Sequence, residues 1–311
     1  MIIFAVESSY TKGMGHLYRS LRICKIFKKK DFLFLINNHG PSLNILKKER
    51  INFKKVDFKK KNWENKILKK YKINLWINDR LNTNASHSKK IINYTRLITF
   101  DDLGSGAKYS DVNFCPLIFK KKIPGKNVYR GLKYLPFDNS LKKYFRKRNK
   151  LKKILILIGG SDNRRLSFKL ANFFNKKKIV TRLIIGPAYG KNSMSVFRNT
   201  KTFSIKKNVK NIFKEYYNYD LLVCSGGMSP FEAASTGLPS MIIATEKFEI
   251  PVGLKLKKMG VSKFMGFYKN INYSKINIDL NILEMSKNCL KIFDLKGLCR
   301  IKNIINNEIK L

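Results

Sequence analysis

The sequence predicts an α/β fold made of two doubly wound domains, each built on a parallel sheet. Short apolar runs alternate with longer amphipathic segments along the whole chain, which is typical of repeated β-α-β units. The apolar runs are continuous, as expected for strands buried on both faces. A dense basic segment at 141–153 then divides the 311 residues into two parts of ordinary domain size.

Eight strands are predicted, four in each part. They are MIIFAV (1–6), FLFLI (32–36), INLWIN (73–78), RLITF (96–100), KILILIG (153–159), VTRLIIG (180–186), DLLVC (220–224) and SMIIA (240–244). Amphipathic segments at 16–30, 164–174 and 209–217 supply helices between them. With the basic segment as linker, the domains are expected at 1–147 and 148–311. The chain from about residue 279 predicts two helices that pack back across the domains.

The charge balance admits two interpretations. Lysine and arginine total 65 against 20 acidic residues, a net charge of +45, which alone predicts a polyanion partner such as nucleic acid or an anionic membrane surface. The lysines are scattered, however, and accompany an excess of Asn, Ile, Phe and Tyr, the residues of A- and T-rich codons. Polyanion binding needs the charge on one face. We therefore expect no nucleic-acid partner, and a positive field that attracts small anions.

Cysteine usage and hydropathy predict the compartment. The five cysteines are odd in number and widely spaced, without a C-x-x-C pair, which favours reduced thiols over a disulfide frame or zinc site. The N-terminal apolar run is too short for a signal peptide, and no stretch approaches the roughly 18 residues of a bilayer span. We expect a cytoplasmic protein without a membrane span, cofactor or metal, and favour a monomer.

Three strand-to-helix junctions contain glycine: 7–19, 157–165 and 223–239. Each would present backbone N–H groups at a helix N-terminus, where phosphate binds well. Each is weak evidence alone, because glycine also makes tight turns, no Walker motif is present and GMGHLY does not complete G-x-G-x-x-G. Two of the junctions lie in the second part at carboxyl ends of strands, the edge where open α/β sheets bind ligands.

The third junction has a helix-start pattern. Ser229 is suited to the N-cap and Pro230 to the first turn. Glu232 then also falls in the first turn. Its carboxylate could complement the helix dipole or bind the two hydroxyls of a ribose. Beside two anion-binding loops we favour the ribose.

The histidine that follows Gly13 and Gly15 is one of only three. His16 lies at or near the first position of a helix, and a histidine there is often only a polar surface residue. The helix N-terminus favours a neutral imidazole, which can accept a proton from water. His39 and His87 lie in polar loop-like contexts and receive no role. The adjacent aspartates 101–102 fit a turn or cap, and we predict no metal site.

Six motifs together resemble one family. GMGHLYRSLRI, FDDLGSGAKYSDV, YRGLKYLP, ILILIGGSD, CSGGMSPFEAASTGLP and LKGLCRIKNII occur here in the order found in the UDP-sugar hydrolases of pseudaminic acid biosynthesis. These are relatives of the MurG-like glycosyltransferases, and the resemblance runs through nearly the whole chain. It implies a GT-B-like fold of two Rossmann-like domains facing across a cleft, with UDP on the C-terminal domain and the sugar facing the N-terminal one.

The resemblance also implies site residues. His16 is the catalytic residue, and the substrate-binding positions are Gly13, Gly15, Gly160, Ser161, Gly226, Gly227, Met228, Ser229 and Glu232. Four departures stand out: VESS where the family has an arginine-aspartate pair, Met228 in place of Ser or Thr, NDRLN (78–82) for an Asp-x-Tyr element, and Phe248–Glu249 for Asn-Gln. All but Met228 concern the sugar half.

The predicted activity is metal-independent hydrolysis of a UDP-sugar, by attack of water on the anomeric carbon. The resemblance implies UDP-2,4-diacetamido-2,4,6-trideoxy-β-L-altropyranose as the substrate. UDP is a good leaving group, which agrees with the absence of a glycosidase-like carboxylate pair. One alternative is an inverting GT-B glycosyltransferase in which His16 deprotonates an acceptor hydroxyl. A further alternative, which the scattered lysines disfavour, is a basic nucleic-acid-binding protein.

Overall fold

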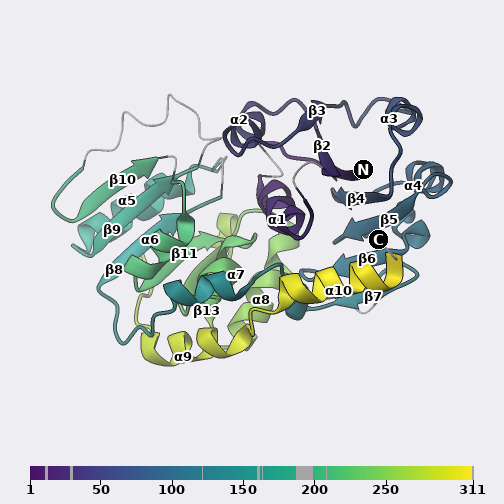
Figure 1. Cartoon of the computed structure of the whole chain (residues 1–311). Helices are drawn as coiled ribbons and strands as arrows, with labels where there is room; N and C mark the ends of the chain where they lie inside the picture. Colours follow the sequence, from purple (N-terminus) through teal and green to yellow (C-terminus); the bar gives the residue numbers. More distant parts are fainter. Residues whose placement is uncertain are drawn as a thin grey trace. The chain divides into compact units, whose positions relative to one another are not determined.

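The computed structural model describes the chain except for residues 11–12, 29–30, 121, 160–161, 163, 187–198, 208 and 310–311 (Figure 1). Its contacts divide it into two compact units. Unit 1 comprises Met1–Asp138 and Lys296–Leu311, and unit 2 comprises Asn139–Leu295.

Unit 1 is built on a seven-stranded parallel sheet. Its strands are β1 (Ile2–Val6), β2 (Phe32–Ile36), β3 (Phe53–Lys55), β4 (Leu75–Asp79), β5 (Arg96–Phe100), β6 (Val112–Cys115) and β7 (Val128–Arg130). Their order is β3-β2-β1-β4-β5-β6-β7, so the winding direction reverses between β1 and β4. Every residue of β1 and β4 is buried, as expected for strands covered on both faces.

Helices cover this sheet and follow from amphipathic spacing. They are α1 (Gly15–Ile23), α2 (Gly40–Lys48), α3 (Asn65–Lys70), α4 (Ala85–Ile92) and α10 (Gly297–Ile309), with short 3-10 turns η1 (Cys24–Ile26), η3 (Ser105–Tyr109) and η4 (Leu132–Tyr134). Asn84 caps α4 by accepting the backbone N–H of His87. The C-terminal helix α10 packs on η4 and buries Ile301 and Ile305, one turn apart.

Unit 2 repeats the plan with six parallel strands. They are β8 (Lys153–Leu157), β9 (Val180–Ile185), β10 (Phe203–Lys207), β11 (Leu221–Ser225), β12 (Ser240–Ala244) and β13 (Ser262–Phe267), in the order β10-β9-β8-β11-β12-β13. The helical elements are η5 (Asn139–Tyr144), α5 (Leu166–Lys176), α6 (Ile212–Asn218), α7 (Ser229–Ala234), η7 (Lys247–Glu249), α8 (Ile250–Lys258), η8 (Tyr268–Asn270) and α9 (Ile282–Ile292). The reversal here lies between β8 and β11, where the two glycine junctions of this unit begin.

All eight predicted strands are confirmed within two residues at their ends. The chain after residue 279 forms two helices, as predicted. Five further strands were not predicted, namely β3, β6, β7, β10 and β13. The sequences FKK of β3 and FSIKK of β10 contain no long apolar run because both are half-exposed strands at a sheet edge. β13 is also an edge strand, and its pairing with β12 shifts register between Ile242 and Ile243.

The two units differ from the predicted domain ranges in two respects. The division falls at Asp138, earlier than residue 147, and the last segment from Lys296 belongs to unit 1. The basic segment 141–153 is anchored in unit 2. The Arg148 side chain is 1% exposed and donates to the carbonyls of Tyr216 at 2.7 Å and Thr236 at 2.6 Å.

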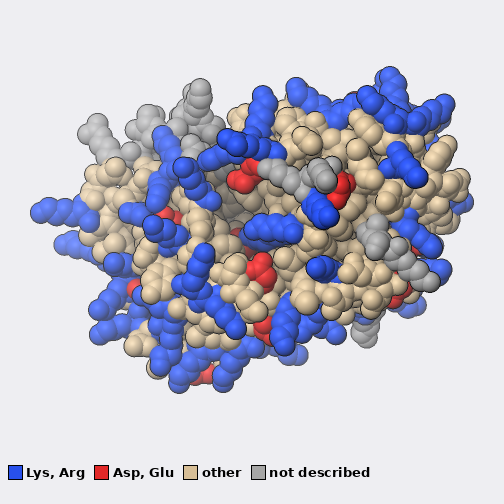
Figure 2. All heavy atoms as spheres, viewed as in Figure 1, with Lys and Arg blue, Asp and Glu red and all other residues tan. Residues whose placement is uncertain are grey.

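The basic side chains do not form one band on the visible face. Figure 2 shows lysine and arginine spread over both units, with few acidic groups among them. In the described part of the chain no helix has the length and apolar character needed to cross a membrane. The five cysteines are free thiols, and only Cys299 is exposed.

Candidate functional site

The candidate site lies where the winding of the unit 1 sheet reverses. β1 and β4 are neighbours there, and Val6 pairs in register with Asp79. The chain leaves β1 for helix α1, while Asp79 is the last residue of β4. Doubly wound sheets bind ligands at this reversal, outside the carboxyl ends of their strands.

His16 makes the central contact of this site. It is the second residue of α1, and its Nδ1 lies 2.8 Å from Oδ1 of Asp79. A carboxylate only accepts hydrogen bonds, so Nδ1 carries the proton and the neutral ring has its basic lone pair on Nε2. The His16 side chain keeps 13% of its surface exposed, whereas Asp79 is fully buried. The imidazole is therefore held in one tautomer and one orientation.

Arg19 and Ser20 complete the shell of Asp79. Arg19 donates through Nε to Oδ2 at 3.0 Å and through Nη2 to Oδ1 at 2.6 Å, a bidentate arrangement. The Ser20 hydroxyl donates to Oδ2 at 3.0 Å. Arg19 Nη2 also lies 3.4 Å from His16 Nδ1, but a guanidinium is a donor only. The shorter contact with Asp79 therefore decides the tautomer of His16.

The buried charges of this shell stabilise one another. Burial alone would raise the pKa of Asp79, but the charge of Arg19 and the hydrogen bonds from His16 and Arg19 lower it to about 2. Burial alone would lower the pKa of Arg19. The charges of Asp79 and Asp101 outweigh this effect and raise the Arg19 pKa. Asp79 is thus an anion at neutral pH. It stabilises a positive charge on His16 when the ring takes a proton.

The two aspartates after β5 have structural partners. Asp101 pairs with Arg19 through Oδ2 and accepts the N–H of Leu117 through Oδ1 at 3.0 Å. Its φ of +49° is an uncommon conformation for a residue other than glycine. Asp102 accepts the backbone N–H groups of Thr83 at 3.1 Å and Gly104 at 2.8 Å. The expected turn role of this pair is confirmed, and Asp101 also supports the site through Arg19.

The glycine turn before α1 places His16. Gly13 has φ +73°, and a Cβ there would meet nothing within 4 Å, so glycine is required by the backbone angle alone. Ser9 and Gly13 exchange two backbone hydrogen bonds of 3.3 and 2.9 Å. Met14 is the N-cap residue and makes no side-chain cap. Gly15 is the first helical residue, so the predicted start of this helix is confirmed.

Sequence reasoning identified His16 but not its partners. Arg19 is three residues after His16 on α1, a spacing that puts both side chains on one helix face. Asp79 is a charged residue at the end of a strand that begins with three apolar residues. Both signals were present in the sequence. Only the strand order brings these residues together, because the winding reverses after β1 and places β4 beside it in the sheet.

The remaining histidines are buried outside this contact. His39 is the N-cap residue of α2, and its Nδ1 lies 2.7 Å from the Ser42 hydroxyl. His87 lies 3.8 Å from Glu64 and stacks on Trp63 with ring centroids 5.2 Å apart. Burial lowers the pKa of both histidines.

In unit 2, the junction after β8 is filled by its own carboxylate. Asp162 accepts the backbone N–H groups of Leu166 at 2.9 Å and Ser167 at 2.8 Å, which are the first donors of α5. An anion from solution would compete with this side chain for the same groups. The predicted contacts Gly160 and Ser161 lie outside the described residues.

The junction after β11 has a similar occupant. Glu249 accepts the backbone N–H groups of Thr245 at 2.6 Å, Glu246 at 3.3 Å and Gly226. A Cβ on Gly226 would lie 2.6 Å from Cβ of Glu249, whereas one on Gly227 would meet nothing within 4 Å. The glycine at 226 is therefore explained by close packing. The free space lies beside Gly227.

Helix α7 starts one residue earlier than predicted, because Ser229 was expected at its N-cap. Met228 is the N-cap position and Ser229 the first helical residue. Glu232 is 7% exposed, and the Tyr216 hydroxyl donates to its Oε2 at 3.4 Å. This contact favours a partly structural role for Glu232 and leaves little of the carboxylate open to a ribose.

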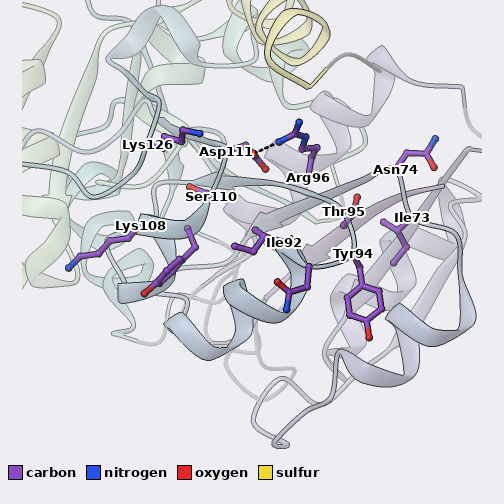
Figure 3. Close-up of a pocket in the computed structure, with 12 residues that line it drawn as sticks. Ile73, Asn74, Ile92, Tyr94, Thr95, Arg96, Lys108, Ser110, Asp111 and Lys126 are labelled. Carbon is purple, nitrogen blue, oxygen red and sulfur yellow. Dashed lines mark hydrogen bonds and ion pairs between the residues drawn. The ribbon is translucent and has the colours of Figure 1, made fainter.

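A hollow of about 700 Å³ lies elsewhere in unit 1 (Figure 3). It is lined by residues that precede β4, β5 and β6, at the amino ends of these strands and away from His16. Its one marked ion pair joins Arg96 Nη1 and Asp111 Oδ1 at 3.1 Å, and Figure 3 shows these two side chains pointing toward each other. Ligands of doubly wound sheets bind at the opposite edge, so the hollow is not our candidate.

Two curated proteins are similar to the chain along its length. The uncharacterized protein MJ1062 of Methanocaldococcus jannaschii is 24% identical over 344 residues, covering 100% of this chain and 71% of the relative. The spore coat polysaccharide biosynthesis protein SpsG of Bacillus subtilis is 21% identical over 330 residues, covering 98% and 97%. No family model matches the chain.

Solved structures settle the fold. MurG of Acinetobacter baumannii aligns with a TM-score of 0.67 at 12% identity, covering 98% of this chain and 99% of that one. The chain, with its two Rossmann-like units, has the GT-B fold. Anabaena Alr3699/HepE in complex with UDP and glucose aligns at 0.63 and 11% identity, covering 98% and 99%. The spinosyn rhamnosyltransferase SpnG complexed with thymidine diphosphate aligns at 0.60 and 11% identity, covering 100% and 96%.

Proposed function

We propose that the chain is a glycosyltransferase that uses a nucleotide sugar as donor and His16 as its general base. The observation that carries the proposal is the 2.8 Å contact between His16 and Asp79 at the reversal of the unit 1 sheet. It leaves Nε2 as the basic atom on a partly exposed ring. A base of this kind typically contributes about 10²–10⁴-fold to a rate.

The reaction balances without a further reactant. The acceptor oxygen forms a bond to the anomeric carbon, and the bond from that carbon to the diphosphate oxygen breaks with its electron pair. The proton of the acceptor hydroxyl moves to Nε2 of His16. The imidazolium that results is stabilised by Asp79, whose own charge Arg19 and Ser20 hold in place.

Nucleotide binding is proposed for unit 2. Gly227, Met228 and Ser229 are the contacts that we favour, because they open helix α7 and a Cβ at Gly227 would meet open space. Gly226 contributes less than expected, since Glu249 already accepts its N–H. The HepE structure, which holds UDP and glucose, supports a UDP-sugar donor by fold analogy.

Transfer to an acceptor is favoured over hydrolysis by the comparisons. SpnG is described as a rhamnosyltransferase, and other chains of the same fold as a forosaminyltransferase and a glycotransferase. SpsG is described as a polysaccharide biosynthesis protein. These are names of relatives, and they support sugar transfer here by analogy alone.

Hydrolysis of the UDP-sugar is the second candidate. It rests on the GMGH, DDL and GLCR motifs, which resemble the hydrolases of pseudaminic acid biosynthesis. His16 would then take its proton from water, and the products would be UDP and free sugar. The site chemistry is the same in both cases, and the two differ only in what fills the acceptor position.

One experiment separates the candidates. The protein is incubated with a panel of UDP-sugars, each with and without hydroxyl acceptors, and UDP, free sugar and glycoside are scored by mass. The proposal predicts glycoside that depends on the acceptor. Free sugar in equal yield without acceptor would favour hydrolysis, and no release of UDP from any donor would contradict both.

A further inference from the structure

Asp101 lies at the carboxyl edge of the unit 1 sheet, beside the candidate site. It directly follows β5, the strand next to β4. Its Oδ2 pairs with Nη1 of Arg19, and its Oδ1 accepts the N–H of Leu117 at 3.0 Å. The backbone N–H of Asp101 donates to the carbonyl of Phe114 at 2.8 Å. Because the main chain and both carboxylate oxygens are held, this carboxylate is a fixed point beside α1.

The guanidinium of Arg19 is shared between two carboxylates. Its Nε and Nη2 donate to Asp79 at 3.0 and 2.6 Å, and its Nη1 donates to Asp101. Its Cζ also lies 5.3 Å from the ring centroid of Phe100. The side chain of Arg19 is 2% exposed, and those of Asp79 and Asp101 are 0% and 4% exposed. A guanidinium held on two sides cannot turn without breaking a buried ion pair, which is strongly unfavourable.

One oxygen of Asp79 accepts from both His16 and Arg19. Oδ1 lies 2.8 Å from His16 Nδ1 and 2.6 Å from Arg19 Nη2, and these two nitrogens are 3.4 Å apart. If the guanidinium turned, Nη2 could donate to Nδ1 instead, and the imidazole proton would then belong on Nε2. Asp101 holds Nη1 and so keeps Nη2 on its own side of Oδ1.

Asp101 also supplies a second negative charge to this shell. With Asp79 alone, the charge of Arg19 would neutralise the carboxylate that His16 contacts. With Asp101 included, two buried carboxylates face one guanidinium, and both raise the pKa of Arg19. A negative charge therefore remains to stabilise the imidazole after it takes a proton.

We propose that Asp101 is a positioning residue for the general base, because it holds Arg19 so that Asp79 keeps His16 in one tautomer. Asp101 touches no reacting atom and acts through Arg19 and Asp79. The role of His16 as a base rests on the proposed function, whereas its positioning can be measured without a substrate. The φ of +49° at Asp101 is tolerated by Asn. Asp101→Asn therefore keeps the side-chain size and main chain and removes the charge.

Imidazole nitrogen NMR of the three histidines tests the positioning. In the wild type at alkaline pH, His16 should show one protonated and one unprotonated nitrogen with well-separated resonances, assigned by their loss in His16→Asn. Asp101→Asn should reduce this separation, because Nη2 of Arg19 is released to donate to Nδ1 and the second tautomer becomes populated. In the wild type itself, the two Nη groups of Arg19 should rotate slowly, since each is held by a carboxylate, and this measurement serves if Asp101→Asn does not fold.

Turnover gives a second readout once the UDP-sugar panel has identified a donor and acceptor. Asp101→Asn should lower kcat by about 10-fold or more, the effect of losing a hydrogen bond between charged groups. KM should be nearly unchanged, because no substrate contact is removed. In the Asp79→Asn background, Asp101→Asn should have little further effect on kcat, because Asp101 acts through Asp79.

Asp102→Asn is the matched control. It changes the neighbouring buried carboxylate, which accepts the N–H groups of Thr83 and Gly104, and should leave the His16 resonances and kcat as in the wild type. Unchanged His16 resonances and kcat in folded Asp101→Asn, additive effects of the Asp79 and Asp101 changes, or fast rotation of the Arg19 Nη groups in the wild type would overturn the proposal. If the His16 resonances shift as expected but no donor releases UDP, the positioning is supported and the proposed function fails.

Discussion

At the scale of single residues, the Nδ1 atom of His16 links the sequence to the proposed chemistry. The sequence places this histidine at a helix start, where the dipole favours the neutral ring. The structure adds Asp79, which favours the opposite charge and fixes the proton on Nδ1. A ring whose Nε2 is free to accept a proton, and whose protonated form Asp79 stabilises, is what a general base requires.

Removal of the Asp79 charge should impair His16 as a general base while leaving the imidazole in place. Asp79→Asn would let Nδ1 be the unprotonated nitrogen, so the wrong tautomer becomes available, and we expect turnover to fall by about 10²–10⁴-fold. Ser20→Ala removes only one hydrogen bond to the same carboxylate and should change turnover less than about 10-fold. Steady-state kinetics of both variants are the measurement. Equal kinetics for Asp79→Asn and wild type would show that Asp79 does not orient His16.

The same carboxylate predicts a pH effect on stability. The pKa of Asp79 falls from 3.8 to about 2 in the folded chain. Because the folded value is the lower one, the stabilisation is fully present above about pH 4 and is lost as pH falls toward 2. The stability difference between wild type and Asp79→Asn should therefore shrink over this range. Urea unfolding at pH 5, 4 and 3 measures it, and a difference that grows on acidification would contradict the assignment.

At the scale of elements, helix ends are closed by the protein's own side chains. Asp162 occupies the start of α5, and Glu249 holds the N–H of Gly226 before α7. Arg148 closes helix C-termini instead of N-termini, because its guanidinium donates to carbonyls that follow α6 and α7. Burial lowers its pKa to about 9, so it remains charged at neutral pH and suits the negative helix ends.

Arg148 should therefore be a stability determinant, although it lies in a segment that resembles a linker. Arg148→Met would leave several buried carbonyls without a donor, and we expect a loss of about 3 kcal/mol or more in the free energy of unfolding. Lys150→Met changes an exposed residue of the same basic segment and should stay within about 0.5 kcal/mol. Chemical unfolding compares the two, and equal stability would mean that Arg148 is dispensable.

The paired glycines before α7 give a second test at this scale. Gly226→Ala forces a Cβ to 2.6 Å from Glu249 and should lower the melting temperature. Gly227→Ala adds a Cβ in open space, so the fold should be unchanged while UDP binding weakens. Thermal unfolding and UDP calorimetry separate the two effects. Normal UDP affinity in Gly227→Ala would remove this loop from the proposed nucleotide site.

At the scale of the whole molecule, hydropathy patterning was sufficient to predict two α/β domains with parallel sheets, and the family resemblance added the GT-B fold. The buried strands β1, β2, β4 and β5 and their counterparts β8, β9, β11 and β12 are continuous apolar runs, and alternation with helices implies parallel sheets. The half-exposed edge strands β3 and β10 lack that signal. His16 was predicted from its glycine turn, but Asp79 could not be joined to it without strand order. Asp162 and Glu249 were missed because neither is the N-cap residue of its helix, so their contacts depend on loop geometry.

UDP binding tests the division of labour between the units. We predict that hydrogen exchange on adding UDP slows in the peptide covering 225–232 of unit 2, and that calorimetry with excess chelator still detects binding. The reason is that N–H groups and the start of α7, rather than a metal ion, would carry the diphosphate charge. Protection confined to unit 1, or loss of all binding on chelation, would contradict this assignment.

The turnover of His16→Ala on the protein's own donor and acceptor tests the central claim most directly. The account predicts a rate at least ~10² lower than that of the wild type, with UDP affinity nearly unchanged because unit 2 is intact. His16→Ala with wild-type turnover would contradict the account and leave His16 as a helix-start residue bound to Asp79.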